Sequence, residues 1–105
     1  MFIEHYKGFD IHATMLPEDA PPADCFDLPE DDMQEILGNI ESGYLQWFCV
    51  RIDARKAGRL LGETYLGGCL YKDLQDFVAT SGYYEDLRSE AIDEARRTIN
   101  EINRE

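Results

Sequence analysis

Residues 2–15 alternate apolar and polar side chains with the period of two that is typical of β-strands. Lys7 and Gly8 interrupt the alternation as a two-residue loop, and Gly8 suits the positive φ that such a loop needs. We therefore predict a β-hairpin with one mostly apolar face, on which Glu4 is the one misfit. The predicted pairs on that face are Tyr6 with Phe9, Glu4 with Ile11 and Phe2 with Ala13, and those on the other face are His5 with Asp10 and Ile3 with His12.

The period changes after residue 27, where apolar residues recur at the i, i+3, i+4, i+7 spacing of a core-facing helix. Asp27 is placed as an N-cap, with Glu30 three residues later as the partner of a capping box. Pro29 is acceptable in a first helical turn, and Gly43 is a suitable C-terminal stop. The apolar stripe, which we expect to hold this helix against the core, consists of Met33, Ile36, Leu37 and Ile40.

Strand-like alternation returns in residues 44–71, and a turn at residues 55–58 divides them into a second hairpin. Three glycines in the return strand indicate a bulge or the close approach of another segment, because glycine leaves space where a side chain would pack. These glycines are Gly62, Gly67 and Gly68.

Residues 72–80 and 83–105 predict a short helix and a long helix. Ala91 and Ala95 are small enough to let the long helix lie close to its neighbour. The length of 105 residues suits a single domain, residues 1–105. We predict an α+β fold with an antiparallel sheet of about four strands in two hairpins, helices packed on one face, and the order ββ-α-ββ-αα.

The charge of the chain is unevenly distributed, with a formal net value of −12. The stretch between Gly8 and Val50 has no lysine or arginine but holds ten carboxylates, and residues 16–28 form a proline-rich loop. One interpretation is a solvated loop and helix face. The other is a carboxylate array for a basic partner, favoured because solvated helices usually intersperse lysines. On that reading the partner-binding residues are Glu18, Asp19, Asp24, Asp27, Glu30, Asp31, Asp32 and Glu35.

The negative charge argues against direct nucleic-acid binding and against anionic membrane surfaces, because both carry the same sign. Cys25, Cys49 and Cys69 are odd in number and form no C-x-x-C pair, which argues against a disulfide scaffold and fits a cytoplasmic protein. The N-terminus lacks the features of a signal peptide. No apolar stretch approaches the roughly 20 residues of a membrane span.

The sequence contains few residues in a pattern that indicates catalysis or metal binding. His5, Asp10 and His12 share one face of the first hairpin, but a metal site needs further ligands and a dry pocket. No motif of nucleophilic or metal-dependent catalysis occurs. We therefore expect no enzyme activity, no metal and no cofactor. The only basic cluster, which we expect to neutralise nearby carboxylates or to protect a sheet edge, is Arg51, Arg55, Lys56 and Arg59.

Trp47 falls on the face opposite to Phe48 and Val50, so it is a candidate interface anchor. In size and charge the chain is similar to small acidic inhibitors of phages and mobile elements, including anti-restriction and anti-CRISPR proteins. The leading hypothesis is a non-enzymatic nucleic-acid mimic that inhibits a basic, nucleic-acid-processing protein. The alternatives are an immunity protein or antitoxin against a basic toxin, an adaptor subunit that binds through Trp47 and the C-terminal helix, and an enzyme or small-ligand sensor. The sequence leaves the oligomeric state open.

Overall fold

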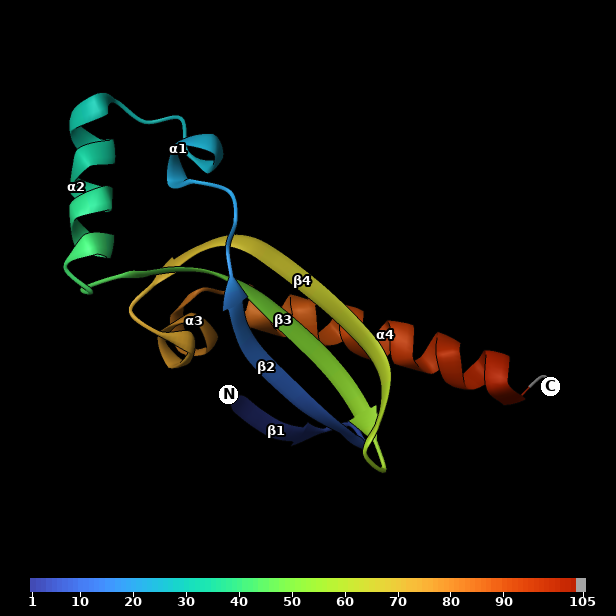
Figure 1. The fold of residues 1–105 in the computed structure, drawn as a ribbon. Coiled ribbons are helices and arrows are strands. Elements are labelled where there is room, and N and C mark those ends of the chain that lie inside the picture. Colours follow the sequence, from blue (N-terminus) through green and yellow to red (C-terminus); the bar gives the residue numbers. More distant parts are fainter. Residues whose placement is uncertain (104–105) are drawn as a thin grey trace.

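The computed structural model describes residues 1–103, which form one antiparallel sheet with the strand order β1-β2-β3-β4 (Figure 1). The strands are β1 (Phe2–Tyr6), β2 (Phe9–Pro17), β3 (Gln46–Lys56) and β4 (Arg59–Tyr71). The helices are α1 (Pro22–Cys25), α2 (Glu30–Glu41), α3 (Leu74–Thr80) and α4 (Tyr84–Asn103). The α+β class is confirmed. The predicted order ββ-α-ββ-αα lacks one element, because α1 forms inside the predicted proline-rich loop.

Both hairpins turn through two residues with positive φ: Lys7 at 51° and Gly8 at 83° in the first, Ala57 at 51° and Gly58 at 78° in the second. Such turns match the twist of the strands that they join. The first hairpin has all five predicted cross-strand pairs. The alternating pattern and the loop length were therefore sufficient to set its register.

The core lies between one face of the sheet and the helices α3 and α4 (Figure 1). At Gly62 in β4 the long helix comes so close that an added Cβ would lie 2.2 Å from the carbonyl oxygen of Ala91 and 2.6 Å from the amide nitrogen of Ala95. Both alanines are fully buried. The predicted close approach is thus confirmed, and its partner is α4.

Glu4, the misfit of the first hairpin, connects β1 to α4. Its Oε1 accepts hydrogen bonds from the Tyr84 hydroxyl at 2.7 Å and from Arg88 Nη1 at 2.6 Å. Partial burial opposes ionisation of Glu4, but these bonds and the charge of Arg88 outweigh it, so the pKa of Glu4 is lowered. The same guanidinium lies 3.6 Å from the centroid of the Tyr6 ring. A polar contact therefore fastens the N-terminal edge strand to the helix layer.

The opposite face of the sheet carries charges. Asp53 in β3 is fully buried, and its carboxylate lies 3.5 Å from Nε of Arg51 and 3.2 Å from Nε of Arg55. Two members of the basic cluster thus neutralise a carboxylate, as predicted. An apolar helix stripe would pack poorly on this face, because the partly exposed guanidinium groups of Arg51 and Arg55 would lose their hydration against it.

The prediction that α2 is held against the core is wrong. None of its residues is buried, and Leu37 is 40% exposed. Figure 1 shows α2 standing away from the sheet at one end of the molecule. The radius of gyration is 16.3 Å, whereas a compact chain of this length has about 13 Å. The reason is competition: α3 and α4 already cover the apolar face, and the other face is charged.

The predicted capping box is also wrong. The helix α2 begins one residue after Pro29, which occupies the N-cap position, and no side chain caps its N-terminus. Asp27 is therefore too far from the first turn to serve as the cap. The acids of the first turn, Glu30, Asp31 and Asp32, lie where the helix dipole stabilises negative charge.

Candidate protein-binding arm

The segment between β2 and β3 leaves the sheet and returns to it, and it contains both α1 and α2. We call residues 22–41 the arm and residues 18–21 its base. Because β2 and β3 are neighbours in the sheet, the two ends of the segment start from one rigid support. The geometry of the base decides how the arm is presented.

The base is fastened to a bulge in β4. The Glu18 carboxylate accepts a hydrogen bond from the Gly68 amide, and a Cβ at Gly67 would lie 2.7 Å from Glu18 Oε1. The indole Nε1 of Trp47 donates to the Ala20 carbonyl oxygen at 2.8 Å. The bulge and the close approach of the base explain Gly67 and Gly68. The sequence predicted a bulge or a close approach at these glycines but did not identify the segment that approaches.

The C-terminal end of α2 is closed by local hydrogen bonds. The Leu45 amide donates to the Asn39 carbonyl oxygen at 3.0 Å, and Gly43 takes a φ of 82°. Further on, Gln46 Nε2 donates to the Lys72 carbonyl oxygen at 2.8 Å. Since both ends of the segment are held, α2 has a defined direction although none of its residues belongs to the core.

The surface of the arm combines two kinds of side chain. Its apolar stripe of Met33, Ile36, Leu37 and Ile40 is half-buried or exposed. Within residues 1–103, no acid of the arm forms an ion pair with a basic side chain. The charge of the arm is therefore uncompensated and available to a partner. The exposed acids of the arm are Asp24, Asp27, Glu30, Asp31, Asp32, Glu35 and Glu41.

The residues predicted to bind a partner have different places. The structure places Asp24, Asp27, Glu30, Asp31, Asp32 and Glu35 on the arm, and Asp19 is exposed in its base. The Glu18 carboxylate instead accepts a hydrogen bond from the β4 backbone, and this contact positions the arm. Trp47 is half-buried, with its ring 5.6 Å from that of Phe26.

The apolar stripe of α2 is the feature that sequence reasoning misassigned to the core. A signal was present: Arg51, Asp53 and Arg55 alternate with the apolar residues of β3, so one face of the sheet had to be polar. Only one apolar face remained, and the long C-terminal helix has the longer stripe to cover it. A second amphipathic helix had no place on the sheet.

Two further candidates from the sequence are the thiol of Cys69 and the pair formed by His5 and Asp10. Burial raises the pKa of Cys69 to about 11, with smaller contributions from Cys49 and Glu18, so its thiol stays protonated at neutral pH. His5 Nδ1 lies 2.9 Å from Asp10 Oδ1 in an exposed pair. In the described part of the chain, residues 1–103, no three metal-binding side chains gather as a metal site. The same residues include no helix that is both long and apolar enough to cross a membrane.

Comparison with known protein families gives no match, and comparisons with curated proteins and with solved structures give none either. The function of the arm is therefore argued from its own chemistry.

Replacing Leu37 by glutamine should leave the free energy of unfolding within about 0.5 kcal/mol of the parent, because the side chain is 40% exposed and lies outside the core. The matched change, Leu87→Gln in α4, should cost about 3 kcal/mol, since Leu87 is 8% exposed within the core. Urea unfolding followed by circular dichroism measures both. Equal losses would mean that α2 is part of the core.

Proposed function

We propose that this protein is a non-enzymatic binding protein whose arm docks into an apolar groove with a basic rim on a partner protein. The observation that supports this most directly is the apolar stripe of α2, which is left outside the core and flanked by carboxylates that have no ion-pair partner among residues 1–103. Amphipathic helices with an apolar face at this spacing commonly bind as helix-in-groove ligands. In such a complex the stripe supplies affinity, while the carboxylates steer the encounter and select a basic partner.

The charge of the arm favours one class of partner. Carboxylates accept charge-assisted hydrogen bonds from the same arginines and lysines that hold nucleic-acid phosphates. We assign the protein to the cytoplasmic inhibitors that act as nucleic-acid mimics on a nucleic-acid-processing effector, in the manner of anti-CRISPR or anti-restriction proteins. An immunity protein or antitoxin against a basic toxin would use the same surface. For the adaptor alternative, the hydrogen bond of Trp47 to Ala20 counts against an indole that is free to anchor a partner.

The test compares two variants that remove the same charge from different helices. The arm variant carries Glu30→Gln, Asp31→Asn, Asp32→Asn and Glu35→Gln. The control variant carries Glu85→Gln, Asp86→Asn, Asp93→Asn and Glu101→Gln, all exposed acids of α4. The partner is first isolated on the immobilised parent protein at low salt and then purified for titration calorimetry.

We expect the arm variant to bind the purified partner roughly 30-fold more weakly than the parent, because four exposed charge contacts of about 0.5 kcal/mol each sum to about 2 kcal/mol. The control variant should bind within about threefold of the parent, because α4 runs along the sheet and away from the arm (Figure 1). A nucleic acid bound by the partner should compete with the parent protein. Equal weakening of both variants, or simultaneous binding of nucleic acid and inhibitor, would refute the proposal.

A further inference from the structure

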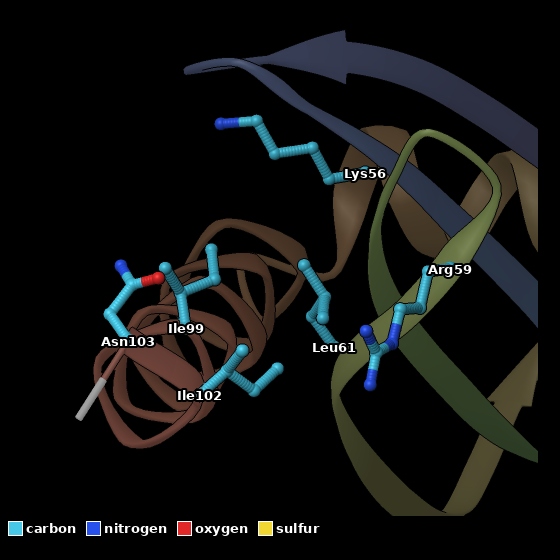
Figure 2. A pocket seen from close by; sticks show the side chains of 6 residues that line it. All are labelled: Lys56, Arg59, Leu61, Ile99, Ile102 and Asn103. Atoms are coloured by element: carbon cyan, nitrogen blue, oxygen red, sulfur yellow. The ribbon is translucent and has the colours of Figure 1, made fainter. Parts of the chain in front are cut away.

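A pocket of about 290 Å³ lies where the β3–β4 turn meets the last turns of α4 (Figure 2). Its apolar part comes from Leu61 of β4 and from Ile99 and Ile102 of α4, and Ile102 is 41% exposed. Figure 2 shows the side chains of Lys56 and Arg59 on separate sides of the opening. The pocket is thus an apolar hollow with a basic rim. We call it the tip pocket, and its lining is Lys56, Arg59, Leu61, Ile99, Ile102 and Asn103.

The two basic side chains at this rim, Lys56 and Arg59, differ in their ion pairing from the nearby arginines of β3. Arg51 and Arg55 are paired with the buried Asp53. Across residues 1–103, neither Lys56 nor Arg59 has a carboxylate within ion-pair distance. Lys56 instead places its ammonium 5.3 Å from the centroid of the Phe9 ring. In a chain with a net charge of −12, the tip pocket therefore offers positive charge around apolar surface.

The complement of this pocket is the arm of the same protein. The arm presents an apolar stripe flanked by acids, and the tip pocket presents apolar residues flanked by bases. The two lie at opposite ends of a molecule whose longest dimension is 56 Å (Figure 1). They cannot meet within one copy, but they can meet between two copies.

We propose that the arm of one copy docks into the tip pocket of a second copy, so that the protein self-associates head to tail. The apolar stripe covers Leu61, Ile99 and Ile102, and the carboxylates of the arm face Lys56 and Arg59. Such a contact is heterologous, so it extends into a short chain or closes into a ring. The same arm serves the proposed partner, and self-association then competes with partner binding.

The test uses charge reversal at exposed positions, which leaves the fold intact. The pocket variant carries Lys56→Glu and Arg59→Glu. The reversed-arm variant carries Asp31→Lys and Glu35→Lys. All four parent residues are exposed. Sedimentation velocity from micromolar to millimolar protein measures association, and circular dichroism confirms that each variant is folded. We expect the parent to associate and each variant alone to associate roughly 100-fold more weakly, because like charges then face each other.

Mixing the two variants should restore association. The negative arm of the pocket variant then meets the positive pocket of the reversed-arm variant. The lysines of the reversed-arm variant meet the negative pocket of the pocket variant. A parent protein that stays monomeric throughout would overturn the inference. A pocket variant that associates as well as the parent would also overturn the inference. The contact would then not involve the tip pocket, and the arms of two copies would be packing on each other. The pocket variant should still bind the partner of the arm, so failure here is distinct from failure of the proposed function.

Discussion

Replacing Gly62 by alanine should lower the free energy of unfolding by about 3 kcal/mol, because the added methyl group has no space. Its Cβ would lie 2.2 Å from a backbone oxygen and 2.6 Å from a backbone nitrogen of α4. Backbone atoms cannot rotate away, so the whole helix must shift and the packing of Ala91 and Ala95 with it. For a domain whose total stability is about 5–15 kcal/mol, this loss is large. Urea denaturation, with the midpoint compared at constant slope, measures it.

The matched control is Gly38→Ala in α2, where an added Cβ meets no atom within 4 Å. Alanine is favoured over glycine inside a helix by about 1 kcal/mol, so this change should leave the core unaffected and raise the helicity of the arm. A Gly62→Ala variant as stable as the parent would show that α4 does not lie against β4 at this position.

Replacing Glu4 by glutamine should cost about 2 kcal/mol at neutral pH, because the Arg88 guanidinium and the Tyr84 hydroxyl lose an ionised acceptor. The side chains of Glu4 and Arg88 are 29% and 14% exposed, so solvent only partly compensates. The exposed pair of His5 and Asp10, at 74% and 49%, provides the control: Asp10→Asn should cost less than about 1 kcal/mol.

The difference between the parent and Glu4→Gln should depend on pH in one direction. The pKa of Glu4 is lowered in the folded state, so the unfolded chain binds the proton more readily. The stabilisation is then fully present above the ordinary pKa of 4.5 and is lost as the pH falls through the lowered value. Unfolding free energies measured from pH 7 downward should converge for the two proteins. A constant difference across this range would contradict the ionised contact.

The candidate site was only partly predictable from the chain. The acids that the arm displays were identified by the absence of lysine and arginine around them, which is a property of sequence alone. The roles of Glu18 and Trp47 were not, because each depends on a segment distant in sequence: Gly68 for the carboxylate and Ala20 for the indole. The tip pocket was not predictable from the sequence either, because its two walls are separated along the chain by most of β4, by α3 and by most of α4.

The sequence by itself determined the strands, the helices other than α1 and the register of the first hairpin, because alternation, turn residues and helical stripes are local signals that need no knowledge of the rest of the chain. It also indicated a bulge or a close approach of another segment at Gly62, Gly67 and Gly68, and it indicated that the small Ala91 and Ala95 would let α4 lie close to its neighbour. Only the tertiary structure decided which amphipathic helix occupies the single apolar face of the sheet. α4 and α2 both carry the pattern of a buried helix, but the area that they can cover is limited. The polar face formed by Arg51, Asp53 and Arg55 accepts neither, so the shorter helix is left outside as the arm.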